Sequence, residues 1–189
     1  LVSIEKGTRR VRIHELQSLA GRYGVSVNAI LRREAVHTDL VPRFRKLRES
    51  EDVHTAEAVQ LLNDLVKAEV ELENVLGVVR ERRYPPERGI SSGDVFELAE
   101  RHAQGLRDEL GLGSGPIADI FTLIELDLGI RLYQRRLKSN SKVSGLFAFD
   151  PSVGACILLN ANHRWGRRVQ SAAHELGHFT GTRQMPEVL

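Results

Sequence analysis

The chain has little of what builds disulfide-linked or membrane-spanning proteins. Its 189 residues include one cysteine, Cys156, one methionine and one tryptophan, and 5% of them are aromatic. A single cysteine excludes an internal disulfide and a zinc site built from several cysteines, so we expect a reducing, cytoplasmic location. The sequence also lacks an apolar run of about 18 residues and a recognisable signal peptide, so no membrane contact is expected.

Charge is nearly balanced over the whole chain but unevenly distributed along it. The formal net charge is +2. Residues 1–48 hold 11 Lys and Arg against 4 Asp and Glu, whereas residues 49–189 hold 16 against 21. A basic N-terminal segment on an acidic remainder predicts a nucleic-acid contact at that end. A solvated helical surface is the alternative explanation of the same charges.

Residues 174–178 carry the most informative motif, which has the form H-E-x-x-H. Around it, apolar and small residues recur at helical spacing: Val169, Ala172, Ala173, Leu176 and Thr180. Residues four apart share one helix face, so His174 and His178 are expected to direct their ring nitrogens at one zinc ion. Glu175 is rotated about 100° from His174, beside the metal, where it can take a proton from the attacking water. The rings of both histidines are expected to point into a cleft bordered by a β-sheet, and Glu175 is expected to line that cleft too. Two surface histidines and an acid on an ordinary helix are the alternative.

The N-terminal segment predicts two helices joined by a short turn. The first runs from Arg12 to Tyr23 and stops at Gly24, and a shorter one runs from Ser26 or Val27 to Leu31. Short helices with small turns are typical of a helix-turn-helix module.

Residues 1–32, from S-x-I-E-K-G to the final I-L, resemble the second half of an XRE-type DNA-binding domain. In that family the recognition helix precedes the I-E-x-G segment, so the resemblance implies that only a stub of it, around Leu1–Ile4, is present. Base-reading residues are therefore not assigned. The remaining candidates for contacts to the DNA backbone are Lys6, Arg9 and Arg10.

A long helix is predicted from His54 to Arg83, after a charged linker over residues 33–52. Its apolar stripe consists of Ala58, Leu61, Leu65, Ala68, Leu72, Val75 and Val79. Pro85 and Pro86 are expected to end it. Two alternatives explain the stripe: the helix packs on its own domain, or it forms the seam of a homodimer.

The second half predicts helices followed by a small antiparallel sheet. The S-x-x-D sequence at residues 91–94 opens a helix whose apolar face includes His102, which we interpret as a packed histidine. Strands are expected over 130–135, 145–149 and 155–160, with a turn at 150–152 joining the last two.

Residues 95–180 resemble the ImmA/IrrE metallopeptidases, through the order L-G-L, P-I, L-G-I, S-G, I-L-L-N and A-H-E-L-G-H. The resemblance implies a zinc-dependent endopeptidase that cleaves an XRE-type repressor. It makes His174 and His178 ligands of Zn²⁺ and Glu175 the catalytic base. The family's third ligand is an acidic residue on the following helix, and this chain stops 11 residues after His178. Residues 1–189 alone are therefore expected to bind zinc weakly and to lack appreciable peptidase activity.

The sequence offers further candidate ligands and partners for the site. The metzincin pattern has a third histidine where this chain has Gln184, so that alternative fails. Glu187 and His163 remain weaker candidates for the third ligand. Tyr133, His163 and the arginines of residues 164–168 are available to stabilise an oxyanion, and nothing selects among them.

The sequence thus predicts a mostly helical α+β fold in three parts. Residues 1–36 form the helix-turn-helix part, residues 37–90 the linker and long helix, and residues 91–189 a zincin-like peptidase domain. The predicted function is zinc-dependent proteolysis of a repressor combined with DNA binding. The alternatives are a DNA-binding regulator with a sensory or structural peptidase-like domain, or a component of a toxin–antitoxin pair.

Overall fold

The computed structural model describes residues 4, 6, 8–31, 39–41, 44, 53–89 and 94–189, with the side chains of residues 28, 29 and 187 left out. The chain divides into two compact units, Leu1–His37 and Thr38–Leu189. The predicted stub of a recognition helix lies almost wholly outside the described residues. None of the helices in the described ranges is long and apolar enough to cross a membrane.

The smaller unit contains the two predicted helices, α2 (Ile13–Tyr23) and α3 (Val27–Leu31). Gly24 ends α2 in the left-handed conformation, with φ 65°, as expected of a residue without a side chain. Arg9 donates two hydrogen bonds to Glu15, at 2.8 and 3.1 Å. These bonds, with one from the backbone N–H of Arg12, lower the pKa of Glu15 to about 2. Arg9, a candidate for contacting DNA, is thus held by a carboxylate of its own unit.

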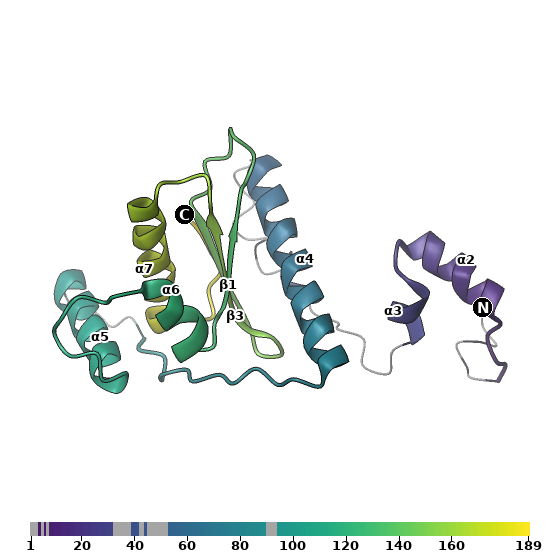
Figure 1. Ribbon diagram of the computed structural model, residues 1–189, viewed down its shortest axis with the longest axis horizontal. Coiled ribbons are helices and arrows are strands. Elements are labelled where there is room, and N and C mark those ends of the chain that lie inside the picture. The colour runs from purple at the N-terminus through teal and green to yellow at the C-terminus, as the bar shows by residue number, and fades with distance from the viewer. Residues whose placement is uncertain are drawn as a thin grey trace. The chain divides into compact units, whose positions relative to one another are not determined.

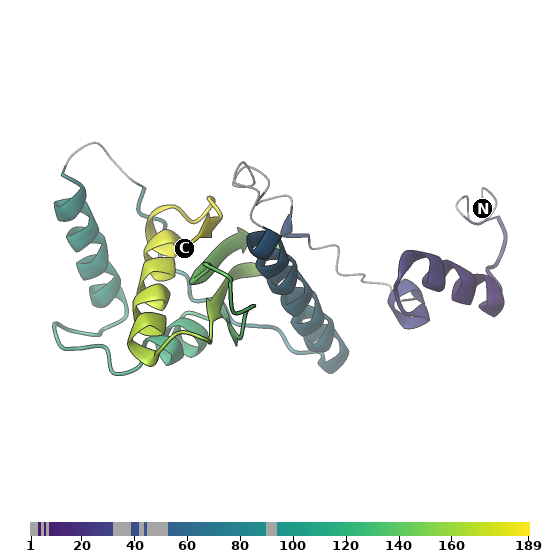
Figure 2. The same ribbon diagram turned by 90° about the horizontal axis from the view of Figure 1, so that it is seen from above.

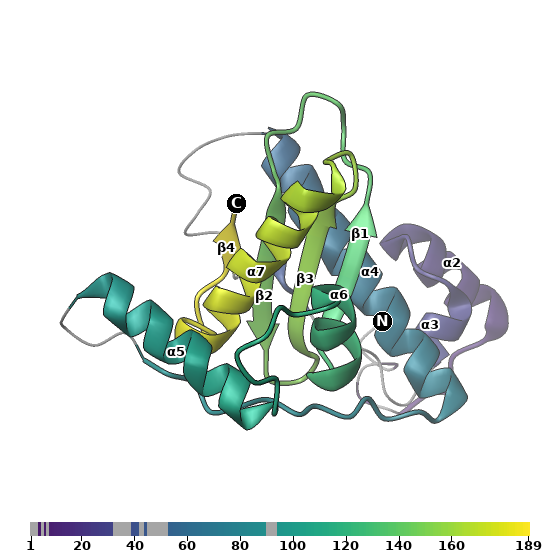
Figure 3. The same ribbon diagram turned by 60° about the vertical axis from the view of Figure 1, so that its left-hand side comes forward.

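The larger unit is built around a sheet in the order β1-β3-β2-β4 (Figure 3). The strands are β1 (Arg131–Arg135), β2 (Gly145–Asp150), β3 (Gly154–Asn160) and β4 (Glu187–Val188). Helices α4 (Val53–Leu76) and α7 (Trp165–Gly181) cover its opposite faces, as Figures 1 and 2 show. Helix α5 (Val95–Glu109) lies against α7, while α6 (Ile120–Thr122) and the π-helical turn η2 (Leu123–Asp127) lead into β1. The mostly helical α+β class is confirmed.

Alternate residues of the strands supply two separate cores. Phe147, Ile157 and Leu159 face α7, whereas Leu146, Cys156 and Leu158 face α4. A strand covered on both faces must be apolar on both, which explains the continuous apolar run of β3. Burial also raises the pKa of the Cys156 thiol to about 12, so this cysteine acts as a small core residue.

The predicted sheet was wrong in one respect, because it is mixed and not wholly antiparallel. Strand β2 pairs antiparallel with both β3 and β4, but β1 runs parallel to β3, with Arg131 opposite Cys156. The local turn at residues 150–152 determines the β2–β3 hairpin. The place of β1 depends instead on contacts far apart in the chain, which strand patterns do not encode.

The long helix is shorter than predicted and packs on the sheet of its own unit. Helix α4 ends at Leu76 because Gly77 takes the left-handed conformation, with φ 65°. Its buried residues are Ala58, Val59, Leu62, Asn63 and Val66. Of the predicted stripe, Ala58 is buried and Leu61 and Leu65 are partly buried against the same core, whereas Ala68 is exposed. The helix thus packs on its own unit, but through a face that only partly coincides with the predicted stripe. Leu72, Val75 and Val79 are 56%, 63% and 92% exposed, and a homodimer through them stays a prediction.

A charged network also fixes α4 to the sheet. Arg131 of β1 is 2% exposed and donates to both carboxylate oxygens of Glu73, at 2.8 and 2.6 Å. Its guanidinium lies 2.9 Å from Glu69, which accepts a hydrogen bond from the Tyr133 hydroxyl. Arg80 binds both carboxylates from the other side. Two cations and two anions thus balance each other in a partly buried network, of which Arg131 is the most buried member.

Candidate metal centre

Helix α7 positions the H-E-x-x-H residues by burying its opposite side in the sheet. Ala172, Leu176 and Phe179 are 0%, 6% and 0% exposed and belong to the core on that face. This apolar stripe fixes the rotation of α7 about its axis. Ala173, predicted to share the stripe, is exposed. The rotation places His174 and His178 on the side of the helix away from the sheet.

His174 and His178 direct their ring nitrogens at each other. Their Nε2 atoms lie 3.1 Å apart, and the ring planes are inclined at 62°. Two nitrogens bound to one tetrahedral zinc ion, each at about 2.05 Å, are about 3.3 Å apart. The two nitrogens are close enough for a direct hydrogen bond, and their spacing is also near that of two adjacent ligands of one zinc ion.

Thr182 lies beside the other ring nitrogen of His178. Its hydroxyl oxygen is 2.9 Å from His178 Nδ1 and 3.5 Å from the His178 carbonyl oxygen. If the hydroxyl donates to the carbonyl, it accepts a hydrogen bond from Nδ1–H, which leaves the Nε2 lone pair for a metal. Such a partner on the remote nitrogen is usual for a metal-binding histidine.

Glu175 lies on the sheet side of α7, contrary to the expectation that it would share a cleft with both histidines. Its side chain is fully buried. A Cβ atom built on Gly145 of β2 would lie 2.4 Å from its Oε1 atom. The reason is the helical rotation: Glu175 follows Ala172 by three residues and precedes Phe179 by four, so it shares their face. The carboxylate is thus held between α7 and the first residue of β2.

The two histidines border a groove of about 740 Å³ between α5 and α7. Its walls are mainly apolar: Val95, Leu98, Ala99, Leu106, Leu112, Ile117 and Ile120 line it, together with Ala173, His174, Leu176, Gly177, His178, Thr180 and Gly181 of α7 and the adjoining Thr182. The sheet contributes none of the lining residues among those described, so the predicted border with the sheet was wrong. The sequence pattern does not indicate where α5 packs, so the groove between α5 and α7 could not be predicted from it.

His102 also lines this groove and belongs to the apolar face of α5. Its Nδ1 atom would lie 3.8 Å from a Cβ atom on Gly181, at the end of α7. It is half-buried, in keeping with the interpretation as a packed histidine. Its spacing of four residues from both Leu98 and Leu106 was the available sign that it faces the groove.

The other candidate ligands do not join the histidines. In the part of the chain that the structure describes, no three or more His, Cys, Asp or Glu side chains gather where they could hold a metal ion. His163 lies in the turn before α7, where burial and then the charge of Arg167 lower its pKa. The backbone of Glu187 pairs with Phe147, and its side chain lies outside the described set.

Three of the candidates for an oxyanion donor, Tyr133, Arg167 and Arg168, are engaged elsewhere. Tyr133 faces α4, on the opposite side of the sheet from α7, and donates to Glu69. Arg167 donates to the Ser144 hydroxyl at 3.0 Å, and Arg168 donates to the Gln134 side chain at 2.5 Å.

Replacing Gly145 with alanine is expected to reduce the free energy of unfolding by about 1–3 kcal/mol. The new methyl group would lie 2.4 Å from Glu175 Oε1 and 3.2 Å from its Cδ atom, so this fully buried side chain would have to shift within the core. Urea denaturation measures the change. Gly166→Ala is the matched control on α7, since no described atom lies within 4 Å of its Cβ position. Equal stability of Gly145→Ala and the wild type would contradict the close packing of Glu175.

The comparison with known families finds a match within the larger unit. Residues 126–186 match the family model Peptidase_M78, described as the IrrE N-terminal-like domain. The match contains β1, β2, β3 and α7, and thus the H-E-x-x-H residues, but it covers about a third of the chain and leaves out the smaller unit. No curated protein and no solved structure matches the chain significantly. The larger unit is therefore similar to the peptidase domain of the ImmA/IrrE family.

Proposed function

We propose that this chain is the peptidase part of a zinc-dependent endopeptidase in which His174 and His178 bind the metal and Glu175 is the general base. The observation that carries the proposal is the 3.1 Å separation of the two Nε2 atoms on α7. The similarity of residues 126–186 to the IrrE N-terminal-like domain supports it. A third ligand would come from a residue outside the described set.

The chemistry would be hydrolysis of a peptide bond. Zinc at these nitrogens would supply a Lewis acid that activates water and polarises the scissile carbonyl. Glu175 would accept a proton from the attacking water and pass it to the leaving amine. Its packing against Gly145 holds the carboxylate in one position, which limits the loss of side-chain freedom during the reaction.

The groove beside the histidines suggests the kind of substrate. Its walls are mainly apolar and its volume is about 740 Å³, enough for one or more large side chains of a bound peptide. We propose that the substrate is a protein segment with apolar residues near the cleaved bond. A repressor of the XRE type is the candidate that the resemblance of the smaller unit suggests, with DNA as a further partner of that unit through Lys6 and Arg10.

A non-catalytic regulator is the second candidate. The absence of a third metal-binding side chain among the described residues favours it. In that case the larger unit would bind zinc or a peptide as a signal and would hydrolyse nothing. Zinc binding alone does not separate the two functions, whereas peptide cleavage does.

Zinc titration of the protein is expected to give one bound ion per chain, and His178→Ala is expected to lose it, because one imidazole is too weak a ligand set. Equilibrium dialysis with metal analysis measures both. The zinc-loaded complete protein is then incubated with a library of natural peptides and the new termini are identified by mass spectrometry. Cleavage that a chelator abolishes supports the peptidase. Binding without cleavage favours the regulator, and an unchanged zinc content in His178→Ala would overturn the metal centre.

A further inference from the structure

One end of the sheet in the larger unit gathers basic side chains. The carboxyl ends of β1 and β3, the connection over residues 136–144 and the first turn of α7 meet there, at the top of Figure 1. We call this surface the basic end. It contains Arg135, Arg136, Lys138, Lys142, Arg164, Arg167 and Arg168. Between residues 130 and 170 the sequence has a single acidic residue, Asp150, which lies at the opposite end of the sheet, across from Gly154.

Hydrogen bonds join the segments that carry these cations. The backbone N–H of Ala161 donates to the Arg135 carbonyl at 2.9 Å, and the Asn162 amide donates to the Leu137 carbonyl at 2.7 Å. Arg167 reaches from α7 to Ser144, before β2, and Arg168 reaches to Gln134 on β1. The basic end is therefore a fixed part of the fold.

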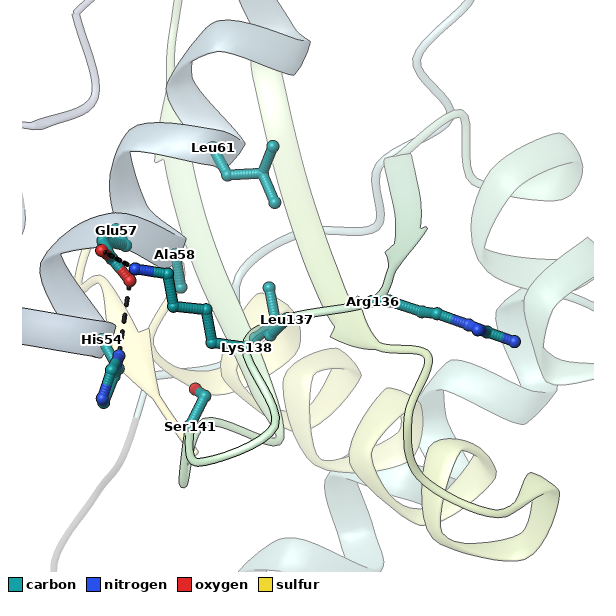
Figure 4. A pocket seen from close by; sticks show the side chains of 8 residues that line it. All are labelled: His54, Glu57, Ala58, Leu61, Arg136, Leu137, Lys138 and Ser141. Carbon is teal, nitrogen blue, oxygen red and sulfur yellow. Dashed lines mark hydrogen bonds and ion pairs between the residues drawn. The ribbon is translucent and has the colours of Figure 1, made fainter.

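Within the described part of the chain, most of these cations have no carboxylate close enough to neutralise them. Lys138 pairs with Glu57 of α4 at 2.5 Å, as Figure 4 shows. Arg136 extends away from that pair in the same view. Arg135, Arg136, Lys142 and Arg164 are exposed and form no ion pair with a carboxylate that the structure describes. The first turn of α7 adds the positive end of a helix dipole.

We propose that the basic end binds the phosphate backbone of a nucleic acid. Five of its seven cations are arginines, whose planar guanidinium groups form paired hydrogen bonds with phosphate oxygens. Contacts to phosphates carry no sequence information, so this surface binds without sequence preference. An acidic protein segment would also be attracted. The nucleic acid is favoured because residues 1–48 of the same chain carry a second excess of seven positive charges, and basic segments of this kind are typical of proteins that bind nucleic acids.

The basic end is separate from the candidate metal centre. Arg164, which precedes α7, and His174 are ten residues apart, which corresponds to about 15 Å along a helix. The histidines face α5, whereas the basic end surrounds the start of α7. Nucleic-acid binding here is therefore independent of whether the protein cleaves peptides.

Fluorescence anisotropy with a labelled duplex DNA of arbitrary sequence tests the proposal over a range of salt concentrations. The variant Arg136→Gln/Arg164→Gln is compared with Arg83→Gln/Arg101→Gln, which removes two exposed arginines elsewhere in the same unit. Each lost phosphate contact lowers the slope of log Kobs against log salt by about 0.9. We expect the first variant to lose about 2 from the slope and at least about tenfold in affinity at 0.1 M salt, and the control to match the wild type.

Binding to two other polyanions, duplex RNA and polyglutamate, distinguishes the possible partners. Duplex RNA of the same length is expected to bind with an affinity similar to that of duplex DNA, because both present phosphates. Tighter binding of one of the two identifies the natural partner. Polyglutamate of equal charge is expected to bind more weakly than either. The proposal is overturned if polyglutamate binds more tightly, if both double variants lose affinity equally, or if Arg136→Gln/Arg164→Gln binds like the wild type. Equal thermal unfolding midpoints ensure that the variants are folded.

Discussion

Replacing Glu175 with glutamine is expected to reduce peptide hydrolysis by the zinc-loaded complete protein about 10²–10⁴-fold. Glutamine keeps the shape of the side chain in its buried position against Gly145 but cannot accept a proton from water. Zinc content is expected to stay unchanged, because His174 and His178 are untouched. Cleavage of a peptide identified from the library, followed over time together with metal analysis, measures both quantities.

The matched control is Glu125→Gln on η2, an exposed acid remote from α7 in sequence. It is expected to cleave the peptide at the wild-type rate. If Glu175→Gln retains zinc and cleaves as fast as the wild type, Glu175 is not the base, although the metal centre still stands. If the variant loses zinc as well, the carboxylate has a role in holding the site together, and the assignment as a base alone is wrong.

Replacing Arg131 with methionine is expected to reduce the free energy of unfolding by about 3 kcal/mol. The substitution leaves Glu69 and Glu73 with Arg80 as their remaining cation. This loss is at the low end of the range for a broken buried ion pair. The side chains of Glu69 and Glu73 are 23% and 17% exposed, so water partly stabilises their charges after Arg131 is removed. Urea denaturation measures the loss.

Arg83→Met provides the comparison, since Arg83 pairs with Glu81 where both side chains are more than half exposed. A surface pair of this kind is worth about 1 kcal/mol or less. The double variant Glu73→Gln/Arg131→Met is expected to recover part of the loss, because it removes one of the uncompensated charges. Equal stability of Arg131→Met and Arg83→Met would mean that the network contributes nothing to the attachment of α4.

The same network sets a dependence on pH. Burial acts to raise the pKa of Glu73, but the hydrogen bonds and charges of Arg131 and Arg80 outweigh it, so the pKa is lowered in the folded protein. A lowered folded pKa stabilises the fold above the ordinary carboxyl pKa, and this contribution is lost as the pH falls through the lowered value. The stability of Arg131→Met should therefore vary less than that of the wild type across this acidic range.

The parts of the molecule that follow from local sequence were predictable. The helix around His174 and His178 follows from the period of its apolar residues. The β2–β3 hairpin follows from two strands separated by a turn. Helix α2 and its end at Gly24 follow from the same kind of signal. In each case residues close in the chain determine the structure, so one sequence is enough.

The parts that depend on distant contacts were not predictable. Helix α4 was extended past Gly77 because Val78 and Val79 continue the apolar pattern, and only the backbone conformation of Gly77 shows the stop. The position of Glu175 depends on which side of α7 meets β2. Tyr133 was a candidate oxyanion donor, but β1 places its side chain on the sheet face that α4 covers. The groove depends on how α5 packs against α7, and no sequence pattern indicates that packing.

Because helices cover both faces of the sheet, the chain can be shortened only at certain places. A fragment cut to residues 126–186, the range that matches the peptidase family, would contain the H-E-x-x-H helix and three of the strands. It would lack α4, and so would open Leu146, Ala148 and Leu158, which are 0% exposed, to solvent. An apolar sheet face left open in this way is prone to self-association. The minimal autonomous form of the peptidase-like unit therefore begins before α4, well upstream of the range that is similar to the peptidase family.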